Sequence, residues 1–249
     1  MTAKDLLEQA DNLYRRGEYS IALRLYEDAR HYNKDRIYQA FIDKNTAQCL
    51  RRIGHVEEAL SVARDGMARL EGLPVSATLG QLLVTEANCG ADLGRHQDAL
   101  HSLRLAEEIF VHLKDSSSLQ QVKVSIARSL AELQCTGEAK HILRSLQSED
   151  CAPEIKTQVL NNLALLEKPT NLEAAESLLL EDLNLQMTLN DDYGLCITLI
   201  NIAGIAIERN DREKALQFLQ QARQAAGRGN AIGLLARITR ITNSIKPDD

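Results

Sequence analysis

The sequence predicts an all-α protein built from stacked pairs of antiparallel helices. Three observations support this prediction: a composition typical of helical proteins, a short segment that recurs along the chain, and two amphipathic stretches in each copy. Only 4 of the 249 residues are Pro, 13 are Gly, and aromatic residues make up 4%. Strand-forming residues are scattered singly, which argues against a β-sandwich or a parallel sheet.

Composition and charge exclude several classes of protein. The 44% of apolar residues can bury a core, which excludes a disordered chain. The net charge of −6 disfavours a general nucleic-acid binder. The longest apolar run, 197–207, is far shorter than the roughly 18 residues that span a bilayer, so we expect no membrane insertion. Because the N-terminus lacks an apolar signal core and the 5 Cys are widely spaced, we expect a cytoplasmic protein with reduced, mostly buried thiols.

The segment from Gly17 to Leu23 returns at 54–60 and 94–100, and weaker copies lie at 135–139, 171–175 and 211–216, in steps of 36 to 40 residues. The Ala of each copy is Ala22, Ala59, Ala99, Ala139, Ala175 and Ala215. Twelve residues before these lie Ala10, Ala47, Ala87, Ala127, Leu163 and Ala203. Four residues after them lie Tyr26, Ala63, Leu103, Leu143, Leu179 and Leu219. We call these three sets of positions ladders. Their spacing relative to one another is the same in all six copies, which is hard to produce by chance.

Each copy contains two amphipathic stretches, separated by a polar break with Gly or Asn that can take a positive φ and end a helix. Small residues on both helices let the backbones approach closely, and the larger residue one turn later fills the adjacent space. One pair cannot bury its apolar faces alone, whereas stacked pairs can. We therefore expect a solenoid of six helix pairs.

The pattern also predicts the bounds of the elements. First helices are expected near 2–16, 36–52, 76–93, 116–133, 153–167 and 191–209. Second helices are expected near 19–31, 56–70, 96–113, 137–148, 171–189 and 212–226, and a capping helix near 230–244 would cover the last pair. No break is long enough for a linker, so we predict one domain over 1–249. Its repeats are expected near 3–35, 36–73, 76–114, 116–149, 153–190 and 191–227.

These residues resemble the tetratricopeptide-repeat (TPR) family, whose signature combines W-x2-L-G-x2-Y, A-x3-F and a closing Pro. The first repeat matches best, through Leu6, Ala10, Leu13, Gly17, Tyr19, Ala22, Tyr26 and Ala29. The resemblance covers nearly the whole chain and implies a right-handed superhelical solenoid with a C-terminal capping helix. The repeats are longer than the roughly 34 residues of the common unit, as in the long-repeat subclass of bacterial regulators and motor light chains.

The sequence departs from the family pattern in places. Most copies lack the aromatic residue of the first helix and the closing Pro. Repeat five departs most, because Leu163 replaces a small residue and Asp182 stands where Ala29 and Ala222 stand in other repeats. We expect the register of repeat five to be the least well defined.

In TPR folds the first helices line a concave groove that holds an extended peptide or a helix. One row projected onto that face is Glu8, Asn45, Thr85, Ser125, Asn161 and Asn201, and the next row is Asp11, Gln48, Asn88, Arg128, Ala164 and Gly204. Amide side chains both donate and accept hydrogen bonds, which suits a peptide main chain. The alternative is that short polar residues are simply tolerated on a half-solvated helix face.

Basic residues on the same face suggest a second feature, a site for an acidic group of a partner. Lys44, Arg51 and Arg52 of repeat two, with Arg128 of repeat four, form a basic lane that would bind a carboxylate of a partner; the alternative is ordinary solvated surface. The TPR clamp for acidic chaperone tails uses a Lys and an Asn in the first repeat. Leu7 and Asp11 occupy those places here, so we predict no such clamp.

The first helix of the sixth repeat, expected near 191–209, is unusually apolar and contains Ile200, Gly204, Ala206 and Ile207. The run is expected to be core beneath the capping helix. The alternative is an apolar end of the groove or a dimer contact, with the last helix moved aside.

The chain contains no hydrolase, phosphate-loop or metalloprotease motif, so we predict a non-enzyme without cofactor or metal. The predicted function is an adaptor or scaffold that binds an extended peptide or helix of another protein. Its predicted contact residues are Asn45, Gln48, Asn88, Arg128, Asn161, Asn201, Lys44 and Arg51. The alternative is a regulatory or sensor module that changes conformation on binding a signalling peptide. Nothing in the sequence indicates a homo-oligomer.

Overall fold

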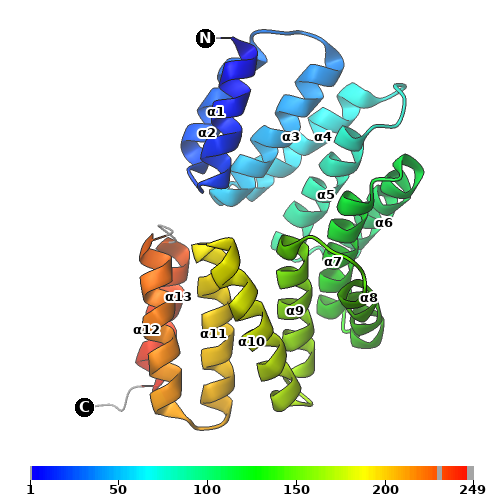
Figure 1. Cartoon of the computed structure of the whole chain (residues 1–249). Helices are drawn as coiled ribbons and strands as arrows, with labels where there is room; N and C mark the ends of the chain where they lie inside the picture. The colour runs from blue at the N-terminus through cyan, green and yellow to red at the C-terminus, as the bar shows by residue number, and fades with distance from the viewer. Residues whose placement is uncertain (1, 229–231, 246–249) are drawn as a thin grey trace. The chain divides into compact units, whose positions relative to one another are not determined.

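The computed structural model describes residues 2–228 and 232–245, and these residues form thirteen helices and no strand (Figure 1). The chain divides into two compact units, 1–139 and 140–249, with the boundary inside α8 (Thr136–Ser148). The single domain over 1–249 stays a prediction.

The first unit is built from helices that each pack on the next along the chain. They are α1 (Ala3–Arg15), α2 (Tyr19–Arg30), α3 (Arg36–Arg52), α4 (Val56–Leu70), α5 (Ala77–Asp92), α6 (His96–Leu113) and α7 (Ser116–Glu132). In addition α3 contacts α5, and α5 contacts α7. These contacts between alternate helices place α3, α5 and α7, the first helices of successive repeats, side by side.

The second unit repeats this arrangement (Figure 1). Its helices after α8 are α9 (Pro153–Glu167), α10 (Leu172–Leu189), α11 (Asp192–Glu208), α12 (Arg212–Arg228) and α13 (Ile232–Ile245). The last helix packs on both α12 and α11, and its Ile238 is fully buried among Cys196 and Leu199. The predicted capping role of α13 is confirmed, although the predicted residues 230 and 231 lie outside the described part. All helix ends within it fall within two residues of those expected.

The three sequence ladders form the contacts between helices. Every member of the three ladders is at most 2% exposed. Positions that are buried in every repeat lie where the helices pack on one another, so the ladders mark the contacts between helices. The repeat phase therefore predicted the core correctly.

Five helix ends use one turn geometry. The second residue after each of five first helices has a positive φ, and these residues are Gly17, Gly54, Gly94, Gln134 and Asn210. At each of them the next N–H bonds back to a carbonyl five residues earlier, as from Cys135 N to Leu130 O at 2.9 Å. Repeat four has neither Gly nor Asn at this place. Gly137 lies inside α8, and Gln134 takes the left-handed conformation instead.

Repeat five uses a different turn. After α9 the Asn171 N–H bonds to Glu167 O at 2.8 Å, a carbonyl four residues earlier and not five, and no residue of this turn has a positive φ. Asn171 then caps α10 by accepting a hydrogen bond from Ala174 N at 2.9 Å. The weak sequence match of this repeat therefore has a structural counterpart.

Two further expectations concern thiols and membranes. Cys49, Cys89 and Cys196 are free and buried, as expected of small core residues, whereas Cys135 is exposed. Within residues 2–228 and 232–245, no helix combines the length and the apolar character needed to cross a bilayer.

Candidate functional site

The predicted polar row is joined by side chains in the second unit. Asn201 Nδ2 of α11 donates a hydrogen bond to Asn161 Oδ1 of α9 at 3.2 Å, and both residues are half-buried. They are 40 positions apart in the chain and hold the same place in successive repeats. The structure thus brings together two of the residues that the sequence selected.

A buried carboxylate determines which atom of each Asn side chain donates and which accepts. Asp182 of α10 is 0% exposed and accepts a hydrogen bond from Asn161 Nδ2 at 3.3 Å. An ionised carboxylate can only accept, so Asn161 must turn its Nδ2 toward Asp182 and its Oδ1 toward Asn201. Asn201 must then present its Nδ2 to Asn161. Its own Oδ1 is left as an acceptor that no described residue occupies.

Two more donors satisfy Asp182. Thr198 Oγ1 lies 2.6 Å from its Oδ2, and Gln186 Nε2 lies 3.3 Å from its Oδ1. Burial raises the pKa of Asp182, while the hydrogen bonds from Thr198, Asn161 and Gln186 oppose the rise. A carboxylate with this many partners holds its neighbours in one arrangement.

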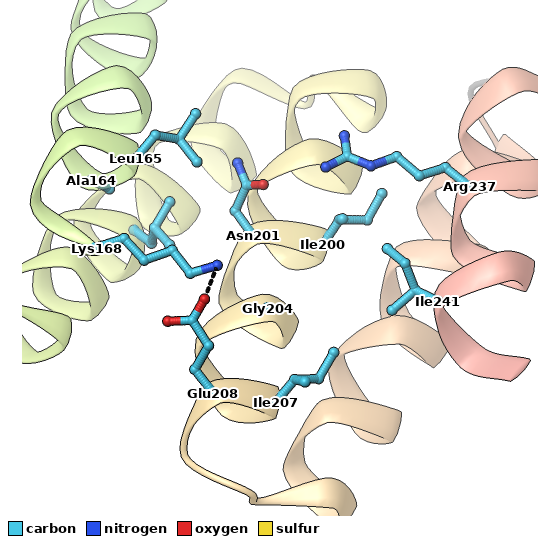
Figure 2. A pocket seen from close by; sticks show the side chains of 11 residues that line it. Ala164, Leu165, Lys168, Ile200, Asn201, Gly204, Ile207, Glu208, Arg237 and Ile241 are labelled. Carbon is cyan, nitrogen blue, oxygen red and sulfur yellow. Dashed lines mark ion pairs between the residues drawn. The ribbon is translucent and has the colours of Figure 1, made fainter. Parts of the chain in front are cut away.

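Asn201 lines a pocket of about 330 Å³ that involves α9, α10, α11 and α13 (Figure 2). The lining residues are Ala164, Leu165, Lys168, Leu179, Ile200, Asn201, Gly204, Ile207, Glu208, Arg237 and Ile241. Most of this wall is aliphatic. A Cβ atom at Gly204 would lie 3.4 Å from Lys168 Nζ, so the missing side chain leaves room in the pocket. Ile200 also belongs to the core beneath α13, whereas Ile207 is half-buried at the pocket.

The pocket has a surplus of positive charge. Lys168 Nζ pairs with Glu208 Oε1 at 2.7 Å (Figure 2). Arg237 extends from α13 toward Ile200 and Asn201 (Figure 2). Among the described residues, no carboxylate forms an ion pair with Arg237. Its guanidinium is therefore available to an anionic group.

In the first unit, other predicted residues link neighbouring helices. Arg128 Nη2 of α7 donates to Asn88 Oδ1 of α5 at 2.7 Å, and Arg51 of α3 pairs with Asp92 of α5 at 2.8 Å. Desolvation and the nearby positive charge of Arg51 lower the pKa of Arg128. The structure thus brings three predicted residues, Asn88, Arg128 and Arg51, to neighbouring helices. The carboxylate of Asp92 already neutralises part of the positive charge of the predicted basic lane.

The remaining predicted residues lie deeper or apart. Asn45 is 5% exposed, and its Nδ2 has no partner among the described residues. Lys44 Nζ lies 4.7 Å from the centre of the Phe41 ring, and burial lowers its pKa. Gln48 is half-buried on the same helix. Lys44 is therefore half-buried against Phe41 and is not a fully exposed member of the predicted basic lane.

Sequence reasoning missed three contributors to the site in the second unit. Asp182 stands at a position that is Ala in other repeats, and a carboxylate at such a packed position is the sequence signal of a buried polar network. Lys168 and Arg237 gave no signal, because they lie in a turn and on the capping helix. Metal binding has no support in the part of the chain that is described, where no three His, Cys, Asp or Glu side chains cluster.

No protein-family model and no curated protein matches the sequence. The structure is similar to NprR in complex with its cognate peptide NprX, with a TM-score of 0.76 and 17% identity over 96% of this chain and 72% of that chain. It is also similar to a Rap protein complexed with Competence and Sporulation Factor, with a TM-score of 0.71 and 14% identity over 96% of this chain and 73% of that chain.

A third similar structure comes from Podosopora anserina, a putative kinesin light chain with nearly identical TPR-like repeats. Its TM-score is 0.55 at 17% identity, and the match covers 76% of this chain and 95% of that chain. Together with the buried ladders and the recurring turn, these similarities show that the chain has the all-α solenoid fold of tetratricopeptide-repeat proteins.

Proposed function

We propose that this chain is a non-catalytic adaptor that binds an extended peptide segment of another protein along the polar rows of its first helices. The observation that carries the proposal is the oriented amide pair, in which Asn201 offers an Oδ1 that no described residue occupies, at the edge of an aliphatic pocket. An extended peptide displays N–H and C=O groups at regular spacing. Amides on the protein bind the main chain, and a pocket beside them selects a side chain.

The first unit would contribute through its own face. Asn88 and Arg128 are already joined across two helices, and Gln48 is half-buried nearby on α3. Asn45 has a buried Nδ2 that has no partner within the part of the chain that the structure describes, and Lys44 and Arg51 complete the proposed set. Such amides and cations suit peptide carbonyls and acidic side chains.

The alternative is a sensor whose conformation changes when a peptide binds. The similar NprR and Rap structures are named as complexes with a cognate peptide and with Competence and Sporulation Factor, which favours peptides as the ligand class in either case. Free thiols, three of them buried, support a reducing, cytoplasmic location.

Peptide selection tests the main proposal. A displayed library of random linear decapeptides would be selected on the wild-type protein, and the enriched peptides would be synthesised and their affinities measured. We expect Asn161→Ala with Asn201→Ala to weaken binding by at least about tenfold, because the main-chain contact of Asn201 is lost together with Asn161, the residue that orients it. Asn184→Ala is the matched control, since Asn184 is exposed on α10. Failure to enrich any peptide, or equal affinity of the double variant, would overturn the proposal.

A second measurement separates adaptor from sensor. Small-angle scattering would be recorded with and without a selected peptide. An unchanged radius of gyration supports the adaptor, and a clear decrease supports the sensor. Peptide circular dichroism in the complex would tell an extended ligand from a helical one.

Catalysis is tested directly, because one solved structure of similar fold is named aspartyl phosphate phosphatase F from Bacillus subtilis. We expect no release of phosphate from an aspartyl-phosphate protein. Turnover that survives repurification and follows the protein through size exclusion would contradict the non-catalytic proposal.

A further inference from the structure

The charges of the pocket favour an anionic ligand. Lys168 and Glu208 neutralise each other at 2.7 Å, and Arg237 is the cation that remains without an ion pair among the described residues. A guanidinium binds a carboxylate through two parallel N–H donors, which suits it better than a compact ammonium group. Arg237 is exposed on α13 while its side chain reaches toward Ile200 and Asn201, so it is free to meet a ligand (Figure 2).

The size and wall of the pocket favour a single aliphatic group. About 330 Å³ lies at the lower end of the roughly 300–1,000 Å³ typical of small-ligand pockets. Ile200, Ile207 and Ile241 form its aliphatic wall (Figure 2), and Gly204 keeps the space open. One branched side chain fits this description, whereas a folded partner segment does not.

The third partner in the pocket is the free Oδ1 of Asn201. The last residue of a peptide has an amide N–H, a side chain and a carboxylate that diverge from a single carbon atom. Asn201, the isoleucine wall and Arg237 offer one partner for each. A fatty acid lacks the N–H, and an internal Asp or Glu lacks the aliphatic group.

We propose that this pocket binds the carboxyl-terminal residue of a peptide. The terminal carboxylate lies on Arg237, the aliphatic side chain packs on Ile200, Ile207 and Ile241, and the last amide N–H donates to Asn201 Oδ1. This inference rests on the peptide-binding function proposed above and adds to it the end and the polarity of the ligand.

Labelled peptide pools test the proposal. The probe is a pool of hexapeptides, labelled at the N-terminus, with random residues in positions one to five and a final Leu that has a free carboxylate. The matched pool has the same Leu as its amide. Fluorescence polarisation on the full chain should show about tenfold tighter binding of the free-acid pool, because one charge-assisted contact is at stake.

Variants on α13 locate the effect. Arg237→Gln should bring the affinity ratio of the two pools close to one, and Arg237→Lys should restore part of it. Arg240→Gln is the matched control, because Arg240 is an exposed Arg on the same helix that does not line the pocket. Both substituted positions are exposed, and circular dichroism will verify that the variants keep their helices.

The outcomes separate this inference from the function on which it rests. Equal affinity of both pools overturns the carboxylate site and leaves peptide binding intact, whereas no binding of either pool overturns both. Displacement of the probe by 4-methylpentanoate at the peptide's own concentration would assign the pocket to small carboxylates and overturn the proposal. A dimer in sedimentation velocity that Arg237→Gln dissociates would assign the pocket to a second copy and overturn it as well.

Discussion

Asn201 of α11 donates a hydrogen bond to Asn161 of α9 at 3.2 Å, across one full repeat of the chain. Asp182 orients this pair, because its buried carboxylate accepts from Asn161 and so determines which atom of each amide faces outward. The orientation of both amides is therefore set by a residue that is itself fully buried.

Replacing Asp182 should destabilise the protein. Asp182→Ala removes the shared acceptor of Thr198, Gln186 and Asn161, and we expect the free energy of unfolding to fall by about 2–4 kcal/mol. Urea unfolding followed by circular dichroism measures the change. Asn184→Ala on the exposed face of α10 should stay within about 0.5 kcal/mol. A loss no larger than this control would show that the network contributes little.

Asp182 should also make stability depend on pH. Burial raises the folded-state pKa of Asp182 above the unfolded value of about 3.9. Between these two pKa values the folded protein therefore binds more protons than the unfolded protein. The contribution of Asp182 to stability is then fully present below the unfolded pKa and is lost as pH rises through the folded pKa. Wild type should gain stability relative to Asp182→Asn between pH 7 and about pH 4. The opposite slope would mean that hydrogen bonding outweighs desolvation.

The close approach of α5 to Phe110 should not tolerate an added methyl group. A Cβ at Gly80 would lie 2.6 Å from Phe110 Cζ, and both residues are buried. Gly80→Ala should therefore cost about 1–3 kcal/mol of unfolding free energy. Gly137→Ala is the control, because no atom lies within 4 Å of that position in α8. Equal thermal midpoints for the two variants would contradict the predicted clash.

The left-handed turn at Gln134 should be improved by glycine. Gln134 has a φ of 63°, where a side chain is strained, and three other repeats have Gly at this place. We expect Gln134→Gly to raise the free energy of unfolding by about 0.5–1 kcal/mol, and Gly94→Ala to lower it by a similar amount. Denaturant midpoints of both variants check the pair. A loss of stability in Gln134→Gly would show that the Gln side chain outweighs the strain.

The thiols should differ sharply in reactivity. Burial raises the pKa of Cys49 to about 12 and that of Cys89 to about 11, so neither forms much thiolate at pH 8. Cys135 is exposed and should react fast with Ellman's reagent. Cys135→Ser should remove the fast phase, and the buried thiols should react only as the protein unfolds. Rapid modification of Cys49 or Cys89 in the native protein would contradict their burial.

Local patterns in the sequence determined the helices, their ends and the ladders that pack them. These features repeat within each copy, so apolar spacing, Ala positions and turn residues predicted them without knowledge of distant contacts. Gln134 is the exception, because this turn forms there, with the same hydrogen bond to a carbonyl five residues earlier, on a residue that is neither Gly nor Asn. The amide row was also predicted, because it keeps the phase of the repeat.

Only the tertiary structure decided which side chains from other helices contact that row. Asp182 meets Asn161 from 21 positions away, and Thr198 from 16, so the buried network depends on helices brought together by packing. The pocket depends likewise on Arg237, whose helix lies outside the repeat pattern. Periodicity reports which face a residue occupies within its own helix. Which side chains from other helices face it, and which charges remain unpaired there, is settled only when those helices are packed together.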